Sequence, residues 1–292
     1  MEYSLEVKNL SKSFGDFALD GVSFSLPQGY IMGFIGPNGA GKSTTIRILL
    51  GLLKRDGGDV KILGQDPILQ SEEIKQRIGV VFDENYLYET LTLLDMKRVV
   101  APFYKRWDEA RFREYIDRFS LPLHKKIKDL SKGMKMKFAL SLALSHHADL
   151  LILDEPTSGL DPVVRSEFLD ILQELMEDEG KSVFFSTHIT SDLERIADYI
   201  TLIDGGKIRF SMTKDEMMER YSLVKGGREL LTESMKEKLI GFKEHAFGFE
   251  GLTERKGELM KEYKEGLVFE KPTLDEIMIY YTRRNPDGTA RA

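Results

Sequence analysis

A glycine-rich segment at residues 36–43 carries the strongest chemical signal in the sequence. It matches the pattern G-x-x-x-x-G-K-[ST] between a strand-like stretch and an apolar helical one, a context that disfavours an ordinary glycine turn. The glycines let the backbone turn tightly, so that its N–H groups converge on phosphate oxygens. Lys42 supplies a cation for the β- and γ-phosphates, and Ser43 supplies a hydroxyl for Mg²⁺. The residues predicted to bind the nucleotide phosphates are Gly36, Pro37, Asn38, Gly39, Ala40, Gly41, Lys42, Ser43 and Thr44.

Two acidic residues follow the apolar run Leu150–Leu153. Such a run is typical of a parallel strand buried on both faces, and ligands of open α/β sheets bind where these strands end. Asp154 is therefore the expected partner of Mg²⁺, through water. Glu155 then lies beside the γ-phosphate, where it accepts a proton from the attacking water. Taken alone, the two acids would equally fit a solvated strand end; the glycine-rich loop favours the catalytic interpretation.

Strands must alternate with helices to bring these groups together. The sequence predicts strands at residues 5–7, 22–26, 30–35, 60–62, 79–82, 150–153, 183–186, 199–203 and 207–210. It predicts helices near residues 43–53, 92–118, 133–147, 162–178 and 190–197. This alternation indicates an α/β core with a largely parallel sheet.

Two regions depart from the alternation. Residues 84–147 are mostly helical, with interruptions at Pro102 and Pro122, and are predicted to form a helical subdomain inserted between two core strands. After Phe210 the sequence becomes rich in charge. We therefore predict a main domain over residues 1–211 and a small α+β appendage over residues 212–292.

Composition excludes several classes of function. The chain has 292 residues, a net charge of −6 and a pI near 5.6, so no nucleic-acid partner is expected. It has no cysteine, and hence no disulfide, no thiolate metal site and no cysteine nucleophile. No signal peptide is recognisable at the start, and no apolar run is long enough to cross a bilayer. A role at a membrane must then be peripheral, through a partner.

The order of the remaining motifs resembles that of ABC ATPases. Leu130-Ser131-Lys132-Gly133-Met134 resembles their LSGGQ signature and lies at a helix start, shortly before the Asp-Glu strand end. The segments 158–161 and 186–188 follow in the family's order. The resemblance covers residues 1 to about 210 and implies a P-loop NTPase core of the ABC ATPase type. An antiparallel β subdomain, the inserted helical subdomain and the small C-terminal α+β appendage complete the expected fold.

The resemblance assigns roles to several residues. Ser131 caps its helix and, with Gly133, presents the helix N-terminus to the γ-phosphate of ATP bound to a second subunit. His188 hydrogen-bonds the γ-phosphate and positions the water, and the loop ending at Asp161 crosses the dimer interface. Phe14 resembles the aromatic residue that stacks on adenine. A core phenylalanine and a structural histidine are the competing interpretations of Phe14 and His188.

Three residues differ from the family pattern. Asp83 stands where the family usually has the glutamine that touches Mg²⁺ and the attacking water. It is still expected to reach Mg²⁺, together with Ser43 and Asp154, although it adds a negative charge near the γ-phosphate. Lys132 replaces the first glycine of the signature, and Met134 replaces its glutamine. Lys42, Glu155 and His188 are all present, so we expect an active ATPase.

The resemblance also implies partners. ATP and Mg²⁺ would be bound between two ATPase subunits, as a homo- or heterodimer, and a separate transmembrane permease would hold the chain at the cytoplasmic face of the membrane. Residues 131–137 and 151–162 resemble bacterial ATPases of type-two exporters, the bacitracin and lantibiotic group. Five aromatic residues would offer anchors for a coupling helix of the permease, or simply form the subdomain's own core: Tyr86, Tyr88, Phe103, Tyr104 and Trp107.

Two other functions compete with transport. One is a soluble ABC ATPase clamp acting on nucleic acid or ribosomes. The short interval between Lys42 and Ser131, the single cassette and the acidic pI disfavour it. The other is a catalytically idle regulatory cassette, for which Asp83 is the one hint.

Overall fold

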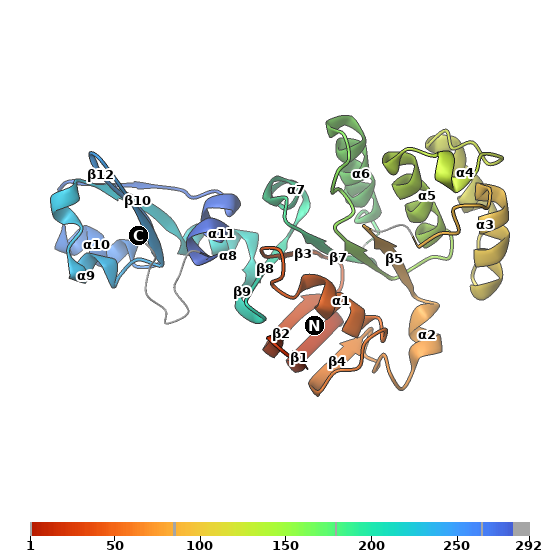
Figure 1. The fold of residues 1–292 in the computed structure, drawn as a ribbon, viewed down its shortest axis with the longest axis horizontal. Helices are drawn as coiled ribbons and strands as arrows, with labels where there is room; N and C mark the ends of the chain where they lie inside the picture. The colour runs from red at the N-terminus through yellow and green to blue at the C-terminus, as the bar shows by residue number, and fades with distance from the viewer. Residues whose placement is uncertain (1, 84–85, 179, 264, 283–292) are drawn as a thin grey trace.

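The computed structural model describes residues 2–83, 86–178, 180–263 and 265–282. Its centre is a six-stranded sheet in the order β5-β6-β7-β3-β8-β9 (Figure 1). The strands are β3 (Ile31–Ile35), β5 (Ile78–Phe82), β6 (Leu150–Asp154), β7 (Ser182–Thr187), β8 (Tyr199–Asp204) and β9 (Lys207–Thr213). All neighbours are parallel except β8 and β9. The predicted parallel core is therefore confirmed.

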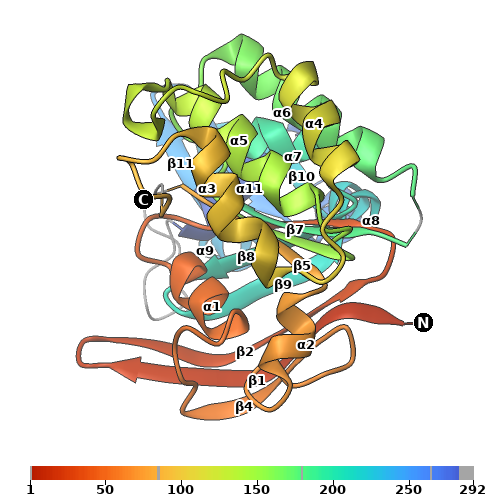
Figure 2. The same cartoon turned by 90° about the vertical axis from the view of Figure 1, so that its right-hand side faces the viewer.

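Successive residues of the apolar strands pack on opposite faces of this sheet. In β6, Leu151 and Leu153 belong to one core cluster, whereas Leu150 and Ile152 belong to the other. This is why the run is apolar without interruption. The first face is covered by α5 (Lys132–Leu144), α6 (Pro162–Leu175) and α7 (Thr190–Ile196), and the second by α1 (Lys42–Leu49) and a smaller sheet (Figures 1 and 2).

The smaller sheet is antiparallel, as the resemblance implied. Its order is β2-β1-β4, formed by β1 (Tyr3–Phe14), β2 (Phe17–Pro27) and β4 (Gly57–Ile62). Each strand is longer than the apolar runs predicted, because its exposed residues also join the hydrogen-bonded ladder. The short helix α2 (Ser71–Lys75) leads from this sheet back to β5.

In residues 86–147, the described part of the inserted region, the chain forms three helices and two short 3₁₀ turns. They are α3 (Leu93–Val100), η1 (Ala101–Phe103), α4 (Glu109–Arg118), η2 (Ile127–Asp129) and α5. The single helix predicted over residues 92–118 is wrong: the chain leaves the α-helix at the 3₁₀ turn that holds Pro102. Asp108 then caps α4 by accepting hydrogen bonds from two backbone N–H groups.

The C-terminal region folds around a second antiparallel sheet, in the order β11-β12-β10-β13. Its elements are α8 (Lys214–Arg220), β10 (Ser222–Gly226), η3 (Arg228–Leu230), α9 (Glu233–Lys236), β11 (Gly241–His245), β12 (Gly248–Thr253), α10 (Lys256–Glu262), β13 (Leu267–Glu270) and α11 (Leu274–Thr282). The appendage is thus α+β, and β9 ends two residues beyond the predicted boundary at 211. In the described ranges, no helix has the length and apolarity needed to cross a membrane.

The last helix returns to the main domain. The backbone N–H of Leu274 donates to the carboxylate of Glu194 on α7 at 2.8 Å. Tyr281 hydrogen-bonds Tyr221 through their hydroxyls at 2.8 Å and packs against Phe210 of β9. The appendage is consequently tied to the core by a buried aromatic cluster as well as by the chain.

Candidate functional site

The parallel register brings four loops to one edge of the main sheet. Phe82, Asp154 and Ser186 are register neighbours, and Ile35 lies level with Thr187 on the adjoining pair of strands. The loops that follow β3, β5, β6 and β7 therefore leave the sheet together. They carry the glycine-rich loop, Asp83, Glu155 and His188, which the sequence placed in one site.

The glycine-rich loop wraps around the head group of Lys42. This side chain is buried, and its Nζ donates to the carbonyl oxygens of Gly36 at 2.8 Å and Pro37 at 3.4 Å. Gly41 has a φ of 111°, and a Cβ there would lie 2.6 Å from Leu19. The loop thus needs glycine at this position, and its cation is held inward where phosphates would enter.

Two of the three predicted magnesium ligands, Asp154 and Ser43, contact each other, whereas the third, Asp83, pairs with Lys132. The Ser43 side chain hydrogen-bonds the Asp154 carboxylate, and the Ser186 hydroxyl donates to Asp154 Oδ1 at 2.6 Å. Burial raises the pKa of Asp154, and these two hydrogen bonds oppose the shift. Among the described residues no group of three or more His, Cys, Asp or Glu could hold a metal. The pair fits Mg²⁺, which takes few protein ligands and completes its shell with phosphate oxygens and water.

Glu155 joins the other two predicted catalytic residues. Its Oε2 accepts a hydrogen bond from His188 Nδ1 at 2.7 Å, and its Oε1 lies 3.4 Å from Lys42 Nζ. Its φ is +50°, which is rare for a residue with a side chain and strains the backbone. The turn aims the carboxylate between the cation and the histidine, as a proton acceptor beside a phosphate requires.

The signature segment forms the start of α5. Ser131 is the N-cap, and its Oγ accepts a hydrogen bond from the backbone N–H of Met134 at 3.2 Å. A Cβ on Gly133 would lie 2.9 Å from Val164 on α6, so glycine permits the close approach of the two helices. Asp161 caps α6, accepting from the N–H groups of Val163 and Val164.

The cap at Ser131 predicts a modest stability effect. Ser131→Ala removes the only side-chain acceptor at the start of α5 and should lower the free energy of unfolding by about 1 kcal/mol. Ser131→Thr keeps a capping hydroxyl and should retain most of the wild-type free energy of unfolding. Urea unfolding followed by circular dichroism measures both variants. Equal losses in the two variants would show that the cap is not the cause.

Phe14 and Asp83 lie at the rim of the same edge. Phe14 ends β1 with 42% of its surface exposed, and Phe17, its register partner on β2, would lie 3.1 Å from a Cβ on Gly41. Phe17 is thus the ring that lies against the glycine-rich loop, and the stacking of the exposed Phe14 on adenine stays a prediction. Asp83 pairs with Lys132 across the start of α5, at 2.7 Å.

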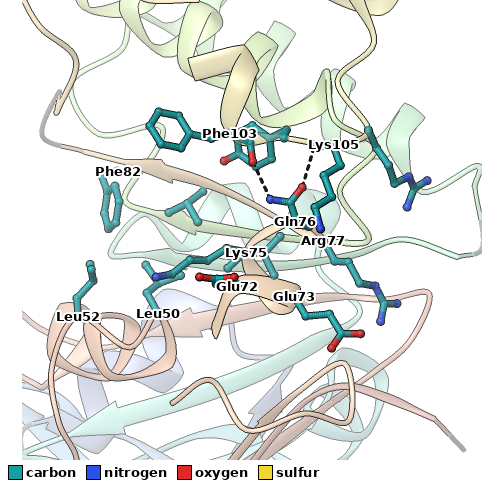
Figure 3. Close-up of a pocket in the computed structure, with 14 residues that line it drawn as sticks. Leu50, Leu52, Glu72, Glu73, Lys75, Gln76, Arg77, Phe82, Phe103 and Lys105 are labelled. Carbon is teal, nitrogen blue, oxygen red and sulfur yellow. Dashed lines mark hydrogen bonds between the residues drawn. The ribbon is translucent and has the colours of Figure 1, made fainter. Parts of the chain in front are cut away.

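A groove of about 1070 Å³ lies between α2, β5 and the inserted region (Figure 3). Gln76 holds its two sides together, donating to the carbonyl of Phe103 at 2.7 Å and accepting from the N–H of Lys105 at 2.8 Å. The Phe103 side chain is 72% exposed. Leu50, Leu52 and Phe82 add apolar surface, and charged side chains of both signs surround it.

The five aromatic residues divide among the groove, the core and the exposed surface. Phe103 and Tyr104 line the groove, and Tyr104 also stacks on the buried ring of His146 with centroids 3.8 Å apart. Tyr86 and Tyr88 are exposed outside it. Trp107 packs against the core residue Phe112, so it is no groove anchor.

Sequence reasoning missed several residues that support the site. Ser186 accepts a hydrogen bond from the backbone N–H of Glu155 as well as donating to Asp154. Asp192, almost fully buried, accepts from Thr157 at 2.6 Å and from Arg165 at 2.5 Å, which fixes the loop leading to Asp161. A serine level with Asp154 in the neighbouring strand was a visible signal, whereas the Asp192 contacts join segments far apart in the chain.

Comparison with known proteins gives consistent matches. A family model described as "ABC transporter" matches residues 19–158. The uncharacterized ABC transporter ATP-binding protein YhcH of Bacillus subtilis is 36% identical over 75% of this chain and 73% of its own length. The bacitracin transport ATP-binding protein BcrA of Bacillus licheniformis is 33% identical over the same shares. The lantibiotic transport ATP-binding protein SrtF of Streptococcus pyogenes is 36% identical over 70% of this chain and 88% of its own.

Solved structures agree with these matches. One described as an ATP binding subunit of an ABC transporter has a TM-score of 0.67 and 31% identity, covering 73% of this chain and 91% of that one. Another, cbiO1 from Clostridium perfringens, described as part of the cbiONQ transporter complex, has a TM-score of 0.64 and 24% identity over 74% of this chain and 91% of its own. At that identity it supports the fold alone.

Proposed function

Because this chain belongs to the ATP-binding proteins of ABC transporters, we propose that it powers a separate membrane permease that exports its substrate. It is an ABC transporter ATPase. In this proposal two ATPase subunits close head to tail around two ATP molecules, and hydrolysis reopens them. The cycle drives the permease between its inward- and outward-facing states.

Glu155 supports hydrolysis most directly, because one carboxylate contacts both Lys42 and His188 at the carboxyl edge of the sheet. Lys42 exchanges the carbonyl groups of the loop for the phosphates of ATP. Glu155 accepts the proton of the attacking water, and His188 holds this carboxylate in place. Ser43 and Asp154 would hold Mg²⁺, which neutralises phosphate charge when bound.

The start of α5 supports a head-to-tail dimer. Its backbone N–H groups carry the partial positive charge of a helix N-terminus, and Ser131 adds a hydroxyl at the surface. Facing the γ-phosphate in a second subunit, they would bind charge that only ATP supplies. Reciprocal contacts about a twofold axis then make two such sites.

The groove supports docking of a cytoplasmic helix of the permease. Exposed Phe103 and Leu52 offer apolar anchors, and the surrounding charges can pair with a polar helix face. Gln76 lies just before β5 and hydrogen-bonds the groove residue Phe103. Asp83 directly follows the other end of β5. Binding of a helix in the groove can therefore change the position of Asp83 at the nucleotide site.

Phe103→Asp tests this docking. It replaces an exposed anchor with a charge and should reduce co-purification of the permease by about tenfold or more, as expected for loss of a hot-spot residue. Tyr88→Asp, an exposed aromatic residue outside the groove, is the matched control and should leave co-purification unchanged. Equal loss in both variants, or in neither, would contradict docking at the groove. ATP binding by the isolated chains confirms that both have folded.

Relatives favour export over other transport. Three of them are named for bacitracin transport, lantibiotic transport and linearmycin resistance. Removal of a compound from the cell explains resistance to it. Such a function places the chain at the cytoplasmic face of the membrane, held by its permease.

Affinity purification from detergent-solubilised native membranes separates this function from a soluble clamp. A transporter ATPase should co-purify with a stoichiometric multi-helix membrane protein. Recovery with ribosomes or DNA, and no membrane protein, would replace transport by the clamp function while leaving the ATP chemistry intact.

A further inference from the structure

We propose that Asp83 and Lys132 act as one charge-matched unit, in which Lys132 neutralises a carboxylate that would otherwise repel the nucleotide phosphates. The inference rests on the proposed ATP site. It makes Lys132 a positioning residue, acting through Asp83. It also accounts for two departures from the family pattern by a single contact.

Asp83 lies at the catalytic edge of the sheet. The preceding residue, Phe82, is the register partner of Asp154, so Asp83 extends beyond the strand beside Glu155. A carboxylate here adds negative charge beside Asp154 and Glu155, where the phosphates of the proposed ATP site would bind. The family's usual glutamine adds none.

Lys132 reaches this carboxylate from the signature helix. It is the first residue after the N-cap Ser131, and its Nζ lies 2.7 Å from Asp83 Oδ1. A Cβ on Gly159 would lie 3.3 Å from the same Nζ. The ammonium thus sits where the end of β5, the start of α5 and the loop before α6 meet, and the family's glycine could make neither contact.

The ion pair between Asp83 and Lys132 contributes little to the stability of the fold. Both side chains are about two-fifths exposed, at 40% for Asp83 and 44% for Lys132, and exposed pairs contribute little to stability. Its effect must instead appear in the binding of an anion. Loss of Lys132 alone leaves an unpaired carboxylate facing phosphates, whereas loss of both charges leaves a neutral site. Asp83→Asn should therefore restore most of the nucleotide affinity that Lys132→Met removes.

A double-mutant cycle with Lys132→Met and Asp83→Asn tests the unit. The affinity for a fluorescent ATP analogue is measured in EDTA, and kcat and KM for ATP are measured with Mg²⁺. K132M should weaken analogue binding about tenfold, the scale of one like charge near the phosphates. D83N/K132M should return to within about twofold of the wild-type value, and K132R should bind as the wild type does.

Lys135→Met is the matched control. Lys135 lies on the same helix and lines the same pocket as Lys132, but it pairs with Glu89 at 3.1 Å instead of with Asp83. K135M removes the same charge from the protein but should not weaken analogue binding, and thermal unfolding shows that each variant is folded.

Two results would overturn the unit while leaving the proposed function standing: K132M binding like K135M, or D83N/K132M remaining as weak as K132M. A wild-type chain that neither binds nor hydrolyses ATP would overturn both.

Discussion

Glu155→Gln should abolish ATP hydrolysis while ATP binding persists. The amide cannot accept a proton, and loss of a positioned general base typically lowers kcat by 10²-fold or more. It retains nearly the same shape beside His188 and Lys42, so the loop is expected to stay folded. Removing a negative charge near the γ-phosphate should also tighten ATP binding. Phosphate release and analogue binding, measured on the same sample, separate the two effects.

Glu167→Gln serves as the control for this experiment. Glu167 lies on α6 and pairs with Lys137 on the surface, so the same chemical change occurs away from the site. Its kcat should match that of the wild type. Hydrolysis by E155Q at the wild-type rate would remove Glu155 from the mechanism and reopen the idle-cassette alternative.

Lys42→Ala should instead eliminate ATP binding. Lys42 is only 6% exposed, and its ammonium is the cation enclosed by the glycine-rich loop. The substitution removes the charge that would bind the phosphates, while Glu155 keeps its hydrogen bond from His188. Affinity for the ATP analogue should fall by about 10²-fold or more.

Lys61→Ala provides the comparison for Lys42. Lys61 is exposed on β4 in the antiparallel sheet. Its substitution should leave the affinity for the ATP analogue unchanged. Together, the two variants distinguish the residues needed for ATP binding from those needed for ATP hydrolysis: K42A should lose binding, and E155Q should lose only hydrolysis. Undiminished ATP affinity in K42A would mean that the nucleotide binds elsewhere.

Local patterns predicted the core of the fold well, and they placed the predicted nucleotide-binding residues at one edge of it. The unbroken apolar runs at Leu150–Leu153 and Val183–Phe185 indicated strands buried on both faces, and both occupy the centre of the sheet. Parallel strands share a carboxyl edge, so residues that follow them must gather there. That geometric rule explains why Lys42 and Glu155 were expected in one site, whereas His188 was added to it by the family resemblance.

Contacts between distant segments could not be predicted in the same way. Lys132 and Asp83 are separated by 49 positions, and both appeared only as departures from a pattern. Leu274 and Tyr281 return from the appendage to the core through contacts that no local periodicity encodes. Pro102 was visible as an interruption, but its effect on the chain path depended on the packing around η1.

Cross-linking tests the head-to-tail dimer most directly, because the natural chain contains no cysteine. Asn38→Cys marks the exposed tip of the glycine-rich loop, and Ser131→Cys marks the signature. Each is introduced into an E155Q chain, and the two chains are mixed with a short thiol-reactive cross-linker. Each single variant alone is the control, since a head-to-tail dimer keeps like positions apart.

A covalent dimer should form in the mixture only when ATP is present, and neither variant alone should form one. Absence of ATP-dependent cross-linking in the mixture, or a dimer from Asn38→Cys alone, would contradict closure of two subunits around ATP.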